Sequence, residues 1–400
     1  MLPFAALVAL LALNVLAMRD VRRMGDRVHA PRARIVWIWI LPFLGGLSSL
    51  IENAAIRRSQ PTAESASGER EQNAAPEQVH VPGAAPFELR SRLVSANGFV
   101  LVDWRAAGAW LATIADESAR AGARVDLHRA WLSHLCECSH EGFRVHESDD
   151  VMILSSLEPD AVRALGRHVT MTRKRVAQLL GALASFPPGL KSVVLVLDDE
   201  EAYYRYVSIY YPGGGEFALS GGMFIDAGCA HFVVRRAELR AIEPTIAHEL
   251  THSALAHLKL PRWLDEGLAV NTEHKLAGAG RGPFTPRQLH ERQRAFWTDE
   301  RIQEFWSGES FFRNDDGNLL SYELARIMVA QMGRSWPAFE QFAKHAQRED
   351  SGAAAARDHM SLDLGAYASL IVEREPSEAW APAIVKDDQA SPVSIDARMA

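Results

Sequence analysis

Residues 244–252, Pro-Thr-Ile-Ala-His-Glu-Leu-Thr-His, form the most informative stretch of this sequence. Pro244 suits the first turn of a helix, because its missing N–H would have no partner there. In such a helix His248 and His252 are four residues apart and share one face. Each could place an imidazole nitrogen about 2.0–2.1 Å from one zinc ion. The stretch therefore predicts two ligands of a single metal site.

Glu249 adds a reactive group to this predicted site. It follows the first histidine by one residue, about 100° round the helix, so its carboxylate can meet a metal-bound water without becoming a ligand. A carboxylate so placed takes the proton of the attacking water and passes it to the leaving group. The pattern predicts hydrolysis by a zinc-activated water, with Glu249 as the general base.

A catalytic zinc site needs a third protein ligand, and residues 260–269, Leu-Pro-Arg-Trp-Leu-Asp-Glu-Gly-Leu-Ala, offer one. Pro261 can open a second helix that returns antiparallel to the first and brings Glu266 to the metal. Asp265 lies about 100° away round that helix and is expected to face elsewhere. Glu273 shares the face of Glu266 two turns later, so it remains the alternative ligand.

These two motifs together resemble the bacterial peptidase MA-like metallopeptidases of the gluzincin group. The resemblance covers about residues 142–370 and includes a strand at 192–197, a tyrosine-rich stretch and a glycine-containing hairpin at 221–234. It implies one zinc per chain held by His248, His252 and Glu266, and a peptide or protein substrate. It also implies a zincin-like α+β fold, in which a mixed sheet packs on the active-site helices.

The same resemblance suggests one more catalytic residue. Related gluzincins place a tyrosine downstream of the third ligand, where it hydrogen-bonds the oxyanion of the tetrahedral intermediate. Tyr322 matches that position, although a core tyrosine is the simpler interpretation. Tyr203, Tyr204, Tyr210 and Tyr211 remain other candidates for the role.

The N-terminal region carries two apolar runs, at residues 2–18 and 35–51. Each is close to the lower limit of about 17 residues for a transmembrane helix. Six arginines between residues 19 and 34 favour a cytoplasmic loop. We therefore expect a two-helix hairpin in a bacterial inner membrane, with the catalytic domain outside the cytoplasm and the bilayer as a partner of residues 2–51. Arg57 and Arg58 leave the reverse topology open, and a signal peptide is the competing interpretation of the first run.

Along the whole chain we expect five regions. These are a transmembrane hairpin with an arginine-rich loop at 1–58, a disordered tether at 59–86, a helical module of unknown role at 87–140, the metallopeptidase domain at 141–380 and a disordered tail at 381–400. We expect strands near 143–156, 192–197, 223–225 and 231–234, and helices near 103–135 and 159–184. The strand at 231–234 either offers a free edge to an extended peptide or lies inside the sheet.

Composition narrows the function further. The net charge is -7 and no long basic run follows the N-terminal region, so we expect no nucleic-acid partner. Three cysteines are too few for a disulfide framework. Two alternatives to a peptidase stay open: a zinc hydrolase of a non-peptide amide or ester, and a catalytically silent, membrane-tethered scaffold. Glu249 argues against a catalytically inactive scaffold, because such a scaffold would need only the histidines.

Overall fold

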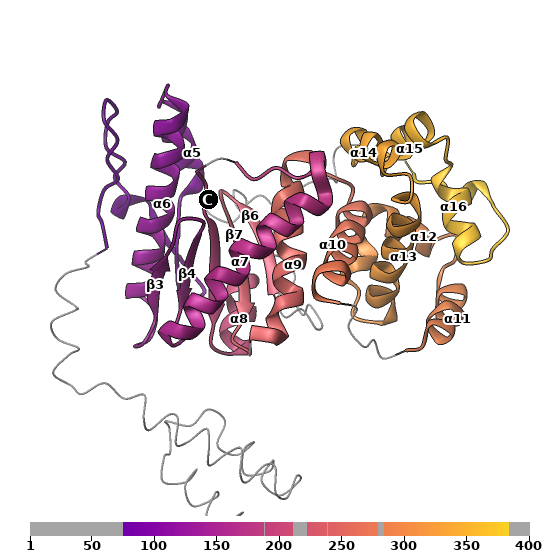
Figure 1. Cartoon of the computed structure of the whole chain (residues 1–400), viewed down its shortest axis with the longest axis horizontal. Helices are drawn as coiled ribbons and strands as arrows, with labels where there is room; N and C mark the ends of the chain where they lie inside the picture. Colours follow the sequence, from indigo (N-terminus) through magenta and orange to yellow (C-terminus); the bar gives the residue numbers. More distant parts are fainter. Residues whose placement is uncertain (1–74, 188, 211–221, 238, 279–283, 384–400) are drawn as a thin grey trace, which may run out of the picture. The chain divides into compact units, whose positions relative to one another are not determined.

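A five-stranded sheet forms the centre of this computed structural model, which describes residues 75–187, 189–210, 222–237, 239–278 and 284–383 (Figure 1). The strand order is β3-β4-β5-β7-β6. The strands are β3 (Arg144–Glu147), β4 (Val151–Ser155), β5 (Ser192–Leu197), β6 (Gly222–Ala227) and β7 (Cys229–Arg235). β4, β5 and β7 run parallel, while β3 and β6 pair antiparallel at the two ends. The described chain thus has the predicted α+β class with a mixed sheet.

Side chains of β5 alternate between two separate hydrophobic cores. Val194 and Val196 face the core that contains the metal-site helices, whereas Val193, Leu195 and Leu197 face the opposite core. Both faces of the sheet are covered by helices, and a strand buried on both faces needs apolar residues at every position. This explains the uninterrupted run Val-Val-Leu-Val-Leu.

The first face of the sheet is covered by α6, and α5 and α8 belong to the same core (Figure 1). The elements on this face are a hairpin of β1 (Leu93–Ala96) and β2 (Phe99–Val102), then α5 (Trp104–Ala112), α6 (Glu117–Glu137) and α8 (Glu200–Val207). The segment predicted as a helical module thus forms one layer over the sheet. The described part of the predicted tether contributes to this core, since Val79 pairs with Phe87 and both are buried.

A buried polar network lies in this first core. His231 of β7 donates from Nδ1 to the carbonyl oxygen of Cys229 at 2.7 Å, and its Nε2 lies 2.8 Å from the hydroxyl of Tyr206. Nδ1 has only a carbonyl oxygen beside it, so the proton is assigned to Nδ1 and the Tyr206 hydroxyl donates to Nε2. Burial lowers the pKa of His231 to about 4, so the ring is neutral at pH 7.

The second face is covered by α7 (Pro159–Leu180) and α9 (Leu239–Leu255), and α10 (Arg262–Ala277) packs against α9. The later helices of the described chain build a helical layer that continues the same core. They are α11 (Pro286–Phe296), α12 (Arg301–Ser307), α13 (Asp316–Met332), α14 (Trp336–His345), α15 (Ala353–Met360) and α16 (Leu364–Ile371).

Two local predictions need correction. The helix expected at 103–135 is broken into α5 and α6, and Asp116 caps the second of them by accepting a hydrogen bond from the amide of Ala119. Pro244 does not open its helix, because α9 already begins at Leu239 and the proline lies inside it. A proline there removes one backbone hydrogen bond of the helix.

The predicted membrane anchor also needs correction. Across the described residues, no helix combines the length and apolar character needed to cross a bilayer. The fold class with a transmembrane hairpin is therefore wrong for this part of the chain, and the inner-membrane location with an extracytoplasmic domain loses its support. The two apolar runs within residues 2–51, on which that prediction was based, lie outside the described residues.

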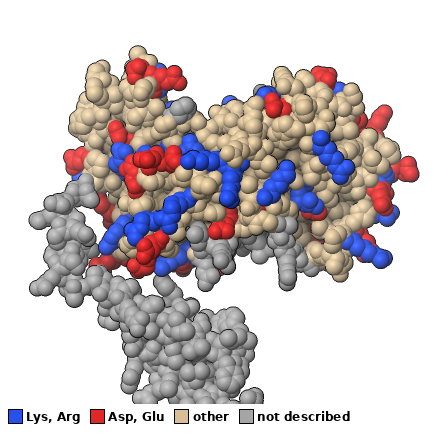
Figure 2. Space-filling model, viewed as in Figure 1, with Lys and Arg blue, Asp and Glu red and all other residues tan. Residues whose placement is uncertain are grey.

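The described surface carries both signs of charge. On the face shown in Figure 2, lysine and arginine side chains lie among aspartate and glutamate side chains. The prediction that the chain has no nucleic-acid partner stays a prediction.

Candidate metal centre

The two histidines of the motif lie on α9, one turn apart and on the same side. Their ring centroids are 4.8 Å apart. The helix is held in place by the opposite stripe, in which Ile246, Leu250 and Ala254 are buried in the second core. Burial of that stripe fixes the rotation of α9 about its axis, so the imidazoles must project toward α10.

The third residue reaches the site because α10 packs closely between α9 and α13. Lys259 has a left-handed conformation that ends the turn after α9, and Pro261 precedes the first residue of α10. Gly267 makes the close approach to α13 possible, since a Cβ there would lie 2.7 Å from the backbone oxygen of Ala325. Glu266, the residue before this glycine, is thereby placed opposite the two histidines.

The three side chains converge on one point. Glu266 Oε2 lies 3.3 Å from His248 Nε2 and 3.4 Å from His252 Nε2. Among the described residues only these three form a cluster of metal-ligating atoms, all within 4.8 Å of one another. Oε2 is buried and has no hydrogen-bond partner within the described part of the chain. The group can therefore hold a metal ion, which would complete the coordination of an otherwise orphaned oxygen.

The other nitrogen of each imidazole faces a carboxylate. His252 Nδ1 lies 2.9 Å from Asp265 Oδ2, and His248 Nδ1 lies 3.1 Å from Glu273 Oε2. With Nδ1 donating its proton to the carboxylate, Nε2 carries the lone pair toward the metal point, which is the usual arrangement of metal-binding histidines. Glu273, the alternative ligand, thus lies on the side of His248 away from Glu266. Asp265 has a role at the site that the sequence did not predict.

The carboxylates give the centre a preference for positive charge. Burial lowers the pKa of His248, but Glu266 and Glu273 outweigh it and raise the pKa to about 9. For Glu266 burial raises the pKa, but the two imidazoles hold it well below its usual range. Glu266 is therefore ionised, as a metal ligand must be.

Glu266 is also held by a cation on its outer oxygen. Arg262, one turn earlier on α10, donates to Oε1 at 3.4 Å. The guanidinium is itself fixed over the ring of Phe312, 4.5 Å from the centroid. Arg262 thus engages Oε1 on the side away from the histidines, and Oε2 is directed at the histidines.

Glu249 is buried beside the histidines, with 6% of its surface exposed. Burial raises the pKa of its carboxyl group, while His248 and His252 partly oppose this shift. The backbone of Phe224 in β6 also lies close enough to this carboxyl group to lower its pKa. The predicted general base thus lies between the metal-ligating residues and β6, the strand at one end of the described sheet.

Tyr322 is brought to the same site by α13. Its ring centroid lies 6.4 Å from that of His248 and 5.2 Å from that of Phe311. Its proposed contact with an oxyanion stays a prediction. Tyr203 and Tyr210 are buried in the opposite core, so they are separated from the histidines by the sheet.

Next to this site the outermost described strand of the sheet is β6. β7 lies between β5 and β6, so the strand at 231–234 is an interior strand. Among the described strands β6 pairs only with β7, and it also packs against α9. Gly222 at its start adjoins Thr245, whose Cγ2 would lie 2.5 Å from a Cβ at that glycine.

No protein-family model matches this chain, and no curated protein shows a significant match to it. The resemblance to gluzincin peptidases therefore rests on the two motifs and the elements around them.

Proposed function

We propose that the protein is a zinc-dependent metallopeptidase, with His248, His252 and Glu266 as ligands and Glu249 as the general base. The observation that carries the proposal is the buried Oε2 of Glu266, which faces two Nε2 atoms and has no hydrogen-bond partner among the described residues. A buried carboxylate oxygen in this position needs a positive charge beside it, which a bound metal ion supplies. Two histidines and one glutamate are a common donor set of catalytic zinc, with a position left for water or substrate.

The residues around the metal point have separate tasks in this proposal. Zinc held there supplies an acidified water and polarises the scissile carbonyl. Glu249 accepts a proton at its carboxylate and delivers it to the leaving amine. The hydroxyl of Tyr322 donates a hydrogen bond to the oxygen on which negative charge develops.

A peptide is the favoured substrate because β6 offers a strand edge beside Glu249. An extended peptide can add to such an edge through backbone hydrogen bonds, which hold it without regard to most of its side chains. The motif resemblance supports the same substrate class. Small amides and esters have no extended backbone to use this edge.

The test is metal analysis of the purified chain together with digestion of a peptide library. We expect one zinc per chain, peptide cleavage that a chelator abolishes, and recovery when zinc is added. His248→Ala should remove the metal, whereas His257→Ala, an exposed histidine of the turn after α9, should keep it.

Three results would contradict the proposal. A chain that binds no zinc, or that cleaves peptides equally well after chelation, rules out this centre as the active site. Zinc-dependent hydrolysis of esters or small amides without any peptide cleavage would favour the non-peptide hydrolase. Full zinc occupancy with no hydrolysis of any of these substrates would favour the silent scaffold.

A further inference from the structure

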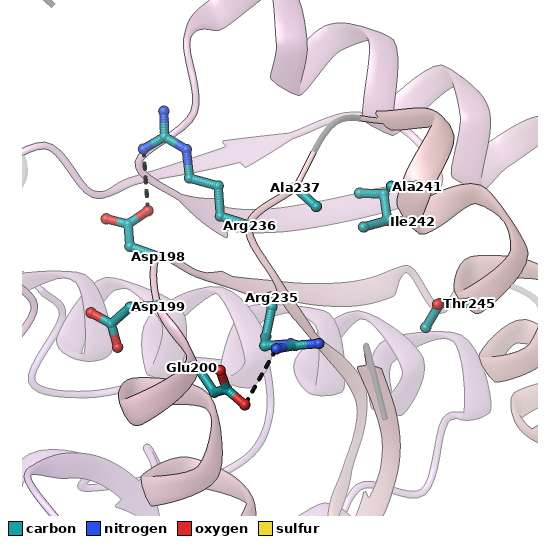
Figure 3. A pocket seen from close by; sticks show the side chains of 9 residues that line it. All are labelled: Asp198, Asp199, Glu200, Arg235, Arg236, Ala237, Ala241, Ile242 and Thr245. Carbon is teal, nitrogen blue, oxygen red and sulfur yellow. Dashed lines mark hydrogen bonds and ion pairs between the residues drawn. The ribbon is translucent and has the colours of Figure 1, made fainter. Parts of the chain in front are cut away.

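A hollow of about 390 Å³ lies at the carboxyl ends of β5 and β7 (Figure 3). From these two parallel neighbours the chain continues to opposite faces of the sheet: α8 follows β5 into one core, and α9 begins after β7 in the other. In sheets with parallel strands, ligands bind preferentially at such a divergence, because the departing connections leave a crevice.

Two acidic residues of the hollow are already engaged by the protein. Asp198 lies 3.3 Å from the guanidinium of Arg236 and 3.0 Å from His140 Nε2, and it also accepts from Ser156. Asp199 caps α8 by accepting a backbone hydrogen bond. These interactions hold both carboxylates in the wall of the hollow.

Arg235 differs from these residues. Within the described part of the chain its one ion pair is with Glu200 at 3.6 Å, and the side chain of Glu200 is 66% exposed. Its Nε is buried and has no hydrogen-bond partner among the described residues. An exposed pair of this kind contributes only about 0–1 kcal/mol. A ligand carboxylate can therefore replace Glu200 at little cost. Figure 3 shows the guanidinium of Arg235 beside Glu200, apart from the pair of Arg236 and Asp198.

The hollow lies next to the proposed active site. Thr245 lines it and adjoins Gly222, the first residue of β6. Phe224, two residues along the same strand, has its backbone close to the carboxyl group of Glu249. Two residues of strand span about 7 Å. A peptide paired with β6, and with its scissile bond at Glu249, therefore passes Gly222, the residue of β6 that adjoins the wall of the hollow at Thr245.

We propose that this hollow is a substrate subsite that selects a carboxylate, which binds Arg235 in place of Glu200. The inference rests on the proposed peptidase function and adds a specificity to it. The carboxylate can belong to an acidic side chain or to the free C-terminus of a peptide.

The test uses the full chain carrying Glu249→Gln, loaded with zinc, so that peptides bind without being cleaved. The probes are alanine-based octapeptides with an amidated C-terminus, in which one Glu or one Gln is moved through the positions. A second set compares a free C-terminal carboxylate with its amide. Calorimetry or fluorescence anisotropy gives the affinities. We expect carboxylate peptides of one set to bind about 10-fold tighter than their neutral partners, the size of a charge-assisted hydrogen bond.

Two variants should change this preference in opposite directions. Arg235→Gln should abolish it and leave neutral peptides unaffected. Glu200→Gln should increase the preference for carboxylate peptides, because the competing carboxylate is gone. Since Glu200 is exposed, this variant still tests the subsite if Arg235→Gln does not fold. Arg287→Gln, which removes an exposed arginine of α11, is the matched control and should leave the preference unchanged.

Equal affinities for acidic and neutral peptides would overturn the subsite and leave the peptidase proposal standing. The same holds if Arg235→Gln weakens both kinds of peptide alike, or if Glu200→Gln lowers the preference. If none of the peptides binds, acidic or neutral, the peptide function itself is overturned and the subsite with it.

Discussion

The carboxylates behind the two histidines should control metal affinity. Asp265→Asn and Glu273→Gln preserve side-chain volume and an oxygen that can accept from Nδ1, but they remove the negative charge. Their hydrogen bonds to the histidines are 2.9 and 3.1 Å long, and the exposed fractions of the two side chains are 32% and 26%. These pairs are therefore only partly screened by solvent.

Outer partners of metal-bound histidines typically change metal affinity 10–100-fold, which is about 1.4–2.7 kcal/mol. We expect each single variant to fall in this range. Glu266→Gln should exceed it, because it neutralises the carboxylate that we propose as a direct metal ligand. Glu291→Gln, an exposed residue of α11, should have no effect. The melting temperature of each metal-free variant shows whether the fold is preserved.

The assay is competition for zinc between the protein and a chromogenic chelator at fixed pH. One outcome would refute the assignment of ligands: loss of zinc in Glu273→Gln with retention in Glu266→Gln makes Glu273 the third ligand. A second would refute the role of the outer carboxylates: wild-type affinity in both Asp265→Asn and Glu273→Gln means that the Nδ1 contacts neither orient the rings nor raise their basicity.

Four further predictions concern catalysis, packing and acid stability. Glu249→Gln should keep full zinc occupancy and a near-normal melting temperature while turnover falls about 10²–10⁴-fold; loss of zinc as complete as in a histidine variant would instead make Glu249 a ligand. Tyr322→Phe should lower kcat about 10²–10³-fold with little change in KM, and unchanged kinetics would leave the tyrosine a core residue. Gly267→Ala should lower stability by about 1–3 kcal/mol in denaturant titrations, because its Cβ would meet the backbone of α13 at 2.7 Å; Gly122→Ala in α6, where a Cβ meets nothing within 4 Å, should be neutral or stabilising. His231 is neutral in the fold with a pKa lowered to about 4 and titrates near 6.5 when unfolded, so it should contribute full stability above pH 6.5 and lose about 3 kcal/mol as pH falls to 4; His231→Gln should reduce this loss in denaturant titrations at pH 7.5 and 4.5, and an identical loss in both proteins would refute the assignment.

Elements that depend on local pattern were predicted well from the sequence. The apolar run at 192–197 and the strand pair around Gly228 were both confirmed, as β5 and as the hairpin of β6 and β7. Their signals are contained within a few residues: β-branched content in the first, and two short apolar runs, at 223–225 and 232–234, in the second. The order of strands was not predicted, because pairing between distant segments leaves no local signal.

Predictions that treated a segment in isolation were less successful. Pro244 was expected to open a helix because that position tolerates a missing N–H, but burial of Ile242 and Ile246 extends α9 to both sides of it. Residues 87–140 carry a helical pattern, and nothing in that pattern shows that Leu127 and Trp131 would cover a sheet formed later in the chain. In both cases tertiary packing decided the outcome.

At the metal centre, too, residues that depend on a single helix were predicted, whereas Asp265, whose role depends on how two helices pack, was not. His248 and His252 were predicted because ligands four apart need only one helix. Asp265 was set aside because it lies about 100° from Glu266 on α10. An imidazole, however, presents its two nitrogens in different directions, so the metal ligand and the outer carboxylate must approach from different sides. The offset between neighbours on α10 allows one helix to supply both, with Glu266 toward Nε2 of His252 and Asp265 toward its Nδ1. An adjacent Asp-Glu pair after a His-Glu-x-x-His helix therefore predicts a ligand together with its supporting carboxylate, provided that the two helices pack antiparallel.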